Sequence, residues 1–135
     1  FIQWLNYHRP FSSVVHRLQI LEQENIEFAV LTTKSIEFTT KLLNCFNLQP
    51  QHVFGHESGS KIDVLNQLLG KRIVQGFIED RRSTLELVLK EPNLKTIPCY
   101  LASWGYLKPH DRNNLPDGIK LLNLETLRKP ISSWS

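Results

Sequence analysis

The sequence predicts an α/β fold of Rossmann-like type, a three-layer sandwich in which helices cover both faces of a mainly parallel sheet. Two observations predict it. Short apolar runs rich in β-branched residues alternate with longer amphipathic stretches, and the connections between them are short, without repeats or linkers. A strand, a helix and a second strand in this order imply a right-handed crossover and parallel pairing. At 135 residues the chain has the size of one domain, so we expect residues 1–135 to form a single domain.

The first half of the chain predicts a helix followed by strand, helix and strand. Apolar residues recur at helical spacing over 11–24, after Pro10, which suits a helix start. Residues 27–31 (EFAVL) form an apolar run typical of a buried strand. Helical spacing returns over 35–46, and a short strand is expected over 52–54, closed by a glycine.

The second half repeats this alternation. A polar hinge over 57–60 precedes a helix with apolar residues from Ile62 to Leu69, which Gly70 ends. The loop over 104–118 is too rich in Gly, Pro, Asn and Asp to be regular. The other elements expected are a strand over 73–78, a helix over 83–91, and strands over 97–101 and 119–122.

The composition is that of an ordinary folded protein. Lys and Arg number 16 against 13 Asp and Glu, which gives a net charge of +3, and hydrophobic residues make up 41%. This balance excludes disordered and collagen-like chains. The positive charges are scattered, so we expect no nucleic-acid partner. No apolar run is long enough to span a bilayer and no leader opens the sequence, so we expect a cytoplasmic protein without membrane contact.

The two cysteines do not form a disulfide framework. Cys45 and Cys99 both lie in apolar neighbourhoods. We therefore expect two buried free thiols in a reducing compartment.

Polar residues that follow the expected strands mark the candidate site, because the functional crevice of an open parallel sheet lies beyond the carboxyl ends of its strands. Thr32 and Thr33 follow the first strand, and Lys61 follows the hinge after the second. Glu79 and Asp80 follow the third. Hydroxyls, an ammonium group and paired carboxylates together suit a phosphate and a divalent cation.

Each of these residues also has a plain structural interpretation. Thr32 and Thr33 either bind an anion at the start of the next helix or cap that helix. Lys61 in a first helical turn opposes the helix dipole unless an anion shares the site, and the alternative is a solvated surface lysine. Adjacent Glu79 and Asp80 repel each other unless a cation offsets them. Their alternative is that Asp80 caps the next helix while the two arginines after it supply the offset.

Taken in order, these pieces resemble the haloacid dehalogenase superfamily of phosphohydrolases. LTTK at 31–34 is similar to the second motif of that family, a strand ending in Thr or Ser. Lys61, which opens a helix after a Gly/Ser hinge, resembles the third motif, and GFIED at 76–80 resembles the acidic fourth motif. The similarity runs from about residue 9 to residue 127.

The resemblance implies a haloacid dehalogenase-like core and a Mg²⁺-dependent hydrolase that acts on a small phosphomonoester through an aspartyl-phosphate. Thr32, Thr33 and Lys61 would bind the phosphate oxygens, with Thr32 and Lys61 as the catalytic residues. Asp80 and Glu79 would hold the Mg²⁺. The expected partner is therefore a small phosphorylated substrate, and self-association stays open.

The first motif of the family is absent from the sequence. That Asp-x-Asp motif ends a central strand between those matching Thr32 and Asp80, and none of the four aspartates here lies in such a motif. The sequence has no methionine and begins at Phe1, so we expect the nucleophile strand to lie outside residues 1–135, with residues 1–9 as the remainder of a cap segment. A strand supplied by another chain and a degenerate protein with a rebuilt sheet are the alternatives.

The alternative function is that of a catalytically inactive remnant of this family. It would bind a phosphate ligand or a partner protein, with the loop aromatics of 104–106 as a contact surface. An aromatic residue in such a loop also covers the edge of a sheet in many proteins. With either function, residues 1–135 alone are expected to be inactive because the nucleophile is missing.

Overall fold

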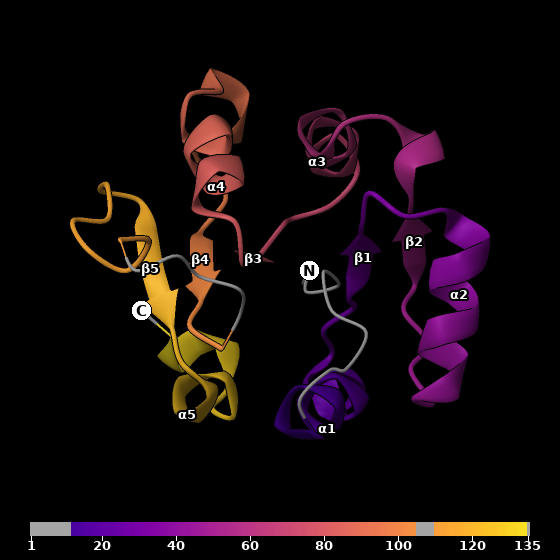
Figure 1. Cartoon of the computed structure of the whole chain (residues 1–135). Helices are drawn as coiled ribbons and strands as arrows, with labels where there is room; N and C mark the ends of the chain where they lie inside the picture. The colour runs from indigo at the N-terminus through magenta and orange to yellow at the C-terminus, as the bar shows by residue number, and fades with distance from the viewer. Residues whose placement is uncertain (1–11, 105–109, 135) are drawn as a thin grey trace.

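In the computed structural model, which describes residues 12–104 and 110–134, the strands form one layer with helices on both sides (Figure 1). The helices and strands are, in chain order, α1 (Ser12–Ile20), β1 (Ala29–Leu31), α2 (Ile36–Cys45), β2 (His52–Phe54), α3 (Lys61–Leu69), β3 (Phe77–Glu79), α4 (Arg82–Leu89), β4 (Cys99–Ala102), β5 (Ile119–Leu122) and α5 (Leu124–Leu127). Short 3₁₀ turns lie at Leu21–Glu24, His56–Ser58, Pro92–Leu94 and Ile131–Ser133. The predicted α/β class is confirmed.

The strands form two parallel sheets rather than the single sheet expected. One sheet has the order β1-β2, with Val30 opposite Val53. The other has the order β3-β4-β5, with Ile78 opposite Tyr100. Every pair is parallel. Within the described part of the chain, no ladder of hydrogen bonds joins β1 to β3.

Both sheets nevertheless share the same two hydrophobic cores, which we call the first core and the second core. Val30 of β1 and Ile78 of β3 belong to the first core, together with buried residues of α1, α2 and α5. Leu31 of β1 and Phe77 of β3 belong to the second core, together with residues of α3 and α4. Alternate residues of a strand point to opposite faces, so this division places both sheets in one layer.

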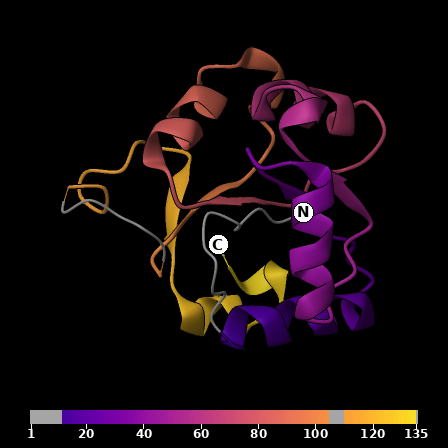
Figure 2. The same ribbon diagram turned by 45° about the vertical axis from the view of Figure 1, so that its right-hand side comes forward.

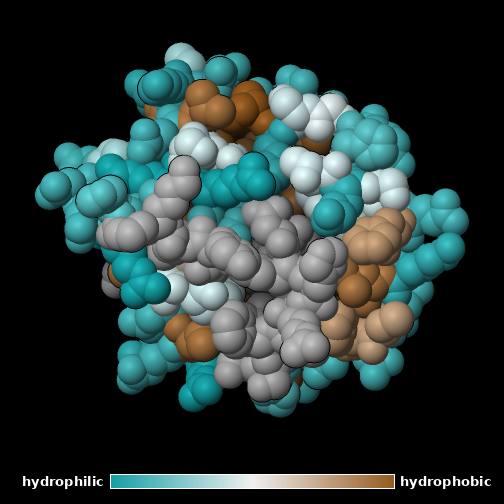
Figure 3. Space-filling view, viewed as in Figure 1, coloured by the Kyte–Doolittle hydropathy of each residue, from teal (hydrophilic) through white to brown (hydrophobic). Residues whose placement is uncertain are grey.

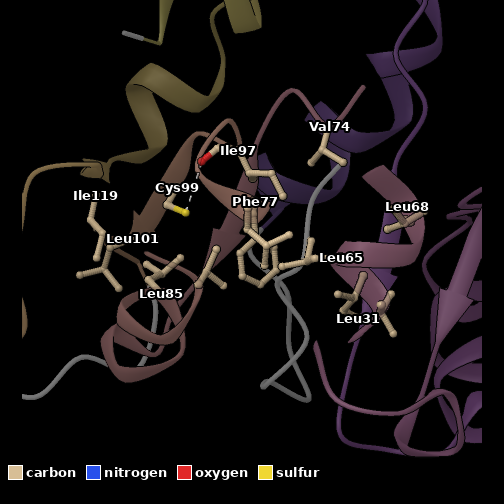
Figure 4. Packing of buried hydrophobic residues seen from close by; sticks show 14 residues of the cluster. Leu31, Leu65, Leu68, Val74, Phe77, Leu85, Ile97, Cys99, Leu101 and Ile119 are labelled. Atoms are coloured by element: carbon tan, nitrogen blue, oxygen red, sulfur yellow. Dashed lines mark hydrogen bonds between the residues drawn. The ribbon is translucent and has the colours of Figure 1, made fainter. Parts of the chain in front are cut away.

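The second core shows how α3 connects the two sheets. Figure 4 draws Leu65 of α3 between Leu31 of β1 and Phe77 of β3. All three side chains are buried, with at most 1% of each exposed. Close packing of apolar groups on one helix therefore holds the sheets together although their backbones are not paired.

The two sheets run in the same direction. At the start of α3, Lys61 pairs with Glu79 at the carboxyl end of β3. Just after α3 ends, Arg72 pairs with Glu27, which precedes β1. Helix α3 is thus antiparallel to both β1 and β3, and the carboxyl ends of the two sheets lie at one edge of the layer. Figure 2, turned by 45°, shows α3 and α4 together on one side of the layer and α1 and α5 on the other.

Several predicted strand boundaries were wrong by a few residues. The strand expected over 73–78 is β3, which starts at Phe77 and includes Glu79, while Ile73 is 89% exposed. The chain uses residues 70–76 to return from the end of α3 to the layer. The strand expected over 97–101 starts only at Cys99, because the Ile97 N–H donates to Leu94 O in the preceding turn and Pro98 has no N–H to donate.

The prediction that both cysteines are buried was wrong for Cys45. Cys99 is buried in β4, whereas Cys45 is exposed, and both are free. Thr39 and Leu43 are the buried residues of α2. Cys45 is two residues beyond Leu43, so it lies on the opposite side of the helix.

A buried arginine fastens α1 to the last part of the described chain. The Arg17 guanidinium donates to the backbone oxygens of Leu127 at 2.7 Å and Lys129 at 3.1 Å. It also pairs with the Glu24 carboxylate. Arg17 is only 2% exposed, so these bonds satisfy a cation that has almost no contact with water.

The helices of the described residues are short. The longest, α2, has 10 residues, and none in this part of the chain is long and apolar enough to cross a membrane.

Candidate functional site

The best-defined polar contact at the carboxyl edge is a buried ion pair. Lys61 Nζ lies 2.6 Å from Glu79 Oε2. The Glu79 side chain has no exposed surface, and the Lys61 side chain is 15% exposed. Two of the residues predicted for the site, from the second and third strand ends, are therefore brought into direct contact.

Glu79 is held on its other oxygen as well. Its Oε1 accepts the backbone N–H of Asp80 at 3.0 Å and that of Arg81 at 3.3 Å. Burial raises the pKa of Glu79 from 4.5 to about 7, and the nearby Lys61 ammonium offsets this only in part. The Glu79 carboxyl thus fastens the β3–α4 turn and the Lys61 side chain together.

This contact explains the position of Lys61 at the start of a helix. The cap of α3 is Ser60, whose side chain accepts the Asp63 N–H at 3.1 Å. A cation in the first turn opposes the helix dipole unless an anion lies beside it. That anion is Glu79, so the interpretation of Lys61 as a solvated surface lysine was wrong.

Asp80 follows β3 and is 3% exposed. The residue in the N-cap position of α4 is Arg81, without a side-chain cap bond, so the suggestion that Asp80 caps this helix was wrong. Arg82, the second of the two arginines that follow Asp80, binds other groups. The Arg82 guanidinium donates to Glu86 at 2.7 Å and to four backbone oxygens of the loop that follows β4, those of His110, Asp111, Asn113 and Asn114.

The backbones of β1 and β3 are not paired with each other among the described residues, and we call this interruption of the strand layer the break. Thr32 and Thr33 follow β1 and so lie across the break from Glu79 and Asp80. Thr32 is buried, its N–H donates to Phe54 O at 2.9 Å, and its hydroxyl oxygen accepts the Lys34 N–H at 3.2 Å. Thr33 is exposed. Neither caps α2, because the cap is Ser35, which accepts the Phe38 N–H at 3.1 Å.

The sequence interpretation missed Glu57, which holds the loops after β1 and β2 together. Its carboxylate oxygens accept the Ile36 N–H at 3.1 and 3.2 Å, at the N-terminus of α2. Hydrogen bonds from backbone N–H groups, first its own and then that of Ile36, hold the pKa of Glu57 below its usual value. A carboxylate of the protein thus occupies a position where an anion would bind. Its only sequence signal was an acid in a polar hinge.

Glycine is required at position 55, where these loops meet. A Cβ atom there would lie 2.6 Å from the Lys34 carbonyl oxygen and 2.7 Å from the Ile36 nitrogen. The His56 N–H also donates to Lys34 O at 2.9 Å. The two loops are therefore in direct backbone contact at the carboxyl edge.

The described residues do not form a metal site by themselves. In this part of the chain no three His, Cys, Asp or Glu side chains are grouped so that they could hold a metal ion. Both oxygens of Glu79 already accept hydrogen bonds from Lys61 and from two backbone N–H groups. Mg²⁺ favours carboxylate and water oxygens in octahedral geometry, so its remaining ligands would have to come from elsewhere.

The aromatic loop of 104–106 is placed only at its first residue. Trp104 packs, partly buried, against the first core. Gly105 and Tyr106 lie outside the described residues.

The chain matches no family model, no curated protein and no solved structure.

Proposed function

We propose that this chain is the core of a haloacid dehalogenase-like phosphohydrolase whose nucleophilic aspartate lies outside residues 1–135. The observation that carries the proposal is the position of the break in the strand layer. Thr32 directly follows the strand on one side of the break, and Asp80 directly follows the strand on the other. The family resemblance puts the Asp-x-Asp strand between these two positions.

The chemistry proposed for the site uses groups from both sides of the break. An aspartate carboxylate attacks phosphorus, the substrate oxygen leaves with a proton from a second carboxyl, and water then hydrolyses the aspartyl-phosphate. The Thr32 hydroxyl and the Thr33 N–H bind phosphate oxygens, and Lys61 offsets the negative charge that builds up on them. Mg²⁺, held by Asp80 with ligands from the missing segment, would supply further charge stabilisation. Glu79, proposed as a second ligand from the sequence, orients Lys61 instead.

The proposal is tested on a longer protein in which the Asp-x-Asp strand that it requires precedes these residues. We expect Mg²⁺-dependent phosphate release from p-nitrophenyl phosphate, and we expect Lys61→Ala to lower kcat by about 100-fold or more. Lys71→Ala, which changes an exposed lysine just beyond α3, is the matched control. Unchanged turnover in Lys61→Ala, or no turnover in the longer protein, would contradict the proposal.

One observation favours the second candidate, an inactive remnant that binds a phosphate ligand or a partner protein. The Lys61 ammonium already has an anionic partner in Glu79. A phosphate would compete with that carboxylate for the charge. Phosphate binding by the longer protein without turnover, measured by calorimetry, would support this candidate. A cytoplasmic location is part of either proposal and is supported by the two free cysteines.

A further inference from the structure

A pocket of about 200 Å³ lies at the amino edge of the strand layer, at the end opposite to the candidate site. Residues 25–29 line it from the turn that leads into β1, and residues 51–52 line it at the start of β2. Leu68 and residues 72–75 line it from the end of α3 and from the segment that leads into β3. None of the residues predicted for the phosphate or the metal belongs to this lining, so a ligand here would be separate from the hydrolase site.

The floor of the pocket is apolar. Phe28 belongs to the first core, and Leu68 and Val74, which Figure 4 labels, belong to the second. These three side chains keep 6%, 8% and 6% of their surface exposed. Ile73 also lines the pocket and is 89% exposed, more than any other large hydrophobic residue of the described chain. An apolar group in the pocket would remove part of this surface from water, which favours binding.

The charged residues around the pocket favour an anion. Arg72 donates from Nη1 to the Glu27 carboxylate, and the two side chains are 49% and 54% exposed. A guanidinium has five N–H donors, and in the described part of the chain only Nη1 of Arg72 has a partner. Glu27 is the only acid among the described lining residues, and the exposed Lys71 beside Arg72 adds a second cation. A carboxylate can accept two parallel hydrogen bonds from such a guanidinium.

Hydrogen bonds hold both walls of the pocket in place. Phe28 N–H donates to Gln51 Oε1 at 2.8 Å, and Gln51 N–H donates to Phe28 O at 3.0 Å. On the side of α3, the N–H groups of Lys71 and Arg72 donate to Leu68 O at 3.0 and 2.8 Å. The site is therefore formed before a ligand arrives, which lowers the entropic cost of binding.

We propose that this pocket binds a small carboxylic acid that carries an apolar ring. The carboxylate pairs with Arg72, and the ring packs on Phe28, Leu68 and Val74 and against Ile73. An engineered cavity of about 150 Å³ lined by apolar side chains binds benzene, so a pocket of about 200 Å³ has room for one ring and a short arm. The inference stands apart from the proposed function, because it requires neither phosphate nor Mg²⁺.

The test uses the 135-residue chain and 3-phenylpropionate as the probe, with the NMR chemical shifts of the backbone amides as the readout. We expect the amides of Phe28, Ala29, Arg72 and Val74 to shift, with a dissociation constant of about 1 mM or tighter. 3-Phenylpropanamide has the same ring without the charge, and acetate has the charge without the ring. Each loses one of the two contacts, so both should bind about tenfold more weakly or worse.

Two variants of the ion pair determine the sign of the ligand charge. Arg72→Gln removes the guanidinium and should weaken the binding of 3-phenylpropionate by about tenfold or more. Glu27→Gln removes the carboxylate that competes for Arg72 and should tighten this binding by about threefold. Arg81→Gln changes an exposed arginine at the carboxyl edge and is the matched control, with unchanged binding.

Ile73→Ser tests the apolar contact without disturbing the fold, because this side chain is already 89% exposed. We expect binding of 3-phenylpropionate to be weakened by about threefold, since part of the apolar area covered by the ring is lost. Leu87→Ser, which changes a leucine of α4 that is 55% exposed, is the matched control and should bind like the parent chain.

Three outcomes would overturn the proposal. The first is the absence of shifts at the pocket amides of the folded chain, which would also result if another part of the chain fills the pocket. The second is that 3-phenylpropanamide binds as well as 3-phenylpropionate, or that Arg72→Gln binds as well as the parent chain. The third is that shifts occur only at the carboxyl edge, at amides such as those of Thr33 and Lys61. Turnover in the longer protein affects none of these results, so failure of the proposed hydrolysis would leave this inference standing.

Discussion

The two sheets of this protein differ in how well the fold protects them. In the larger sheet β3 and β4 are buried along their whole length, and the edge strand β5 has two buried and two exposed residues. In the smaller sheet β1 is buried, but β2 has one exposed and two half-buried residues. Figure 3 shows brown and tan side chains at the surface on the side of the molecule where β2 and α2 lie.

The comparison shows that backbone pairing is not what stabilises the smaller sheet. A sheet of two three-residue strands is marginal by itself. Its stability comes from α2 and α3 and from local bonds such as Phe28 N–H to Gln51 Oε1 at 2.8 Å. The larger sheet has a buried ion pair at its carboxyl end and the Arg82-bound loop beside it. The predictions below test this contrast.

The largest expected effect comes from removing a large side chain from each sheet. Phe77 in β3 has no exposed surface, whereas Phe54 in β2 is half-buried. We expect Phe77→Ala to lower the free energy of unfolding by about 3–5 kcal/mol and Phe54→Ala by about 1–2 kcal/mol, since the cost grows with the apolar area that the ring buries. Urea unfolding measures both. Equal losses of stability would mean that the smaller sheet is packed as well as the larger one.

The buried Glu79 carboxyl of the larger sheet should contribute to the pH dependence of stability. The folded-state pKa of Glu79 is about 7, above its ordinary value of 4.5, so the folded protein binds this proton more tightly. The free energy of unfolding should therefore fall as the pH rises from about 4.5 to 7, by roughly 3 kcal/mol, through this group.

Glu79→Gln isolates this contribution, because the amide does not titrate. We expect a flatter dependence of the urea midpoint on pH between about 5 and 7 in this variant, measured without added metal. Glu37→Gln changes an exposed glutamate of α2 and is the matched control. An unchanged slope in Glu79→Gln would contradict the effect of burial on this carboxyl.

Two adjacent arginines test how the larger sheet holds its loop. Arg82 binds Asn113 O at 2.6 Å and Asn114 O at 2.8 Å, while Arg81 is exposed. Arg82→Ala should cost about 1–2 kcal/mol in unfolding free energy and speed up proteolysis within 110–114. Arg81→Ala should change stability by less than about 0.5 kcal/mol. Equal proteolysis rates in the two variants would argue against this role of Arg82.

The smallest expected effect concerns the two thiols. Cys99 lies in the larger sheet, and Cys45 lies on α2, which packs on the smaller sheet. Burial raises the pKa of Cys99 in β4 to about 11, whereas Cys45 on α2 is exposed. Iodoacetamide at about pH 8 should therefore label only Cys45 in the folded protein and both thiols in urea, as read by mass spectrometry. Labelling of Cys99 without denaturant would indicate that the larger sheet opens readily.

The kinds and order of the elements from α1 to β5 were predictable because each has its own apolar pattern, whereas the short helix α5 (Leu124–Leu127) was not expected from the sequence. The periodicity of 35–46 and 62–69 appears as α2 and α3. The boundaries were less predictable, because they depend on contacts with residues distant in the sequence. Pro98 O accepts the Phe77 N–H, and residues 70–76 return from the end of α3 to the strand layer.

The candidate site was predictable only in part. Its residues could be found because they follow strands, but their partners depend on packing. Glu79 is 18 residues from Lys61, and Glu57 is 21 residues from Ile36. These contacts arise when α3 packs on β3 and when the loops after β1 and β2 meet. The division of the layer into two sheets likewise depends on which backbone edges find partners.

The buried Arg17 has a consequence for synthesis of the protein on the ribosome. Its backbone acceptors, Leu127 and Lys129, are more than a hundred residues further along the chain. While the nascent chain is still short of these residues, the guanidinium must stay hydrated and α1 cannot dock in its final place. The helix α1 is therefore expected to complete its docking after translation of the region around α5, late in the folding of the nascent protein.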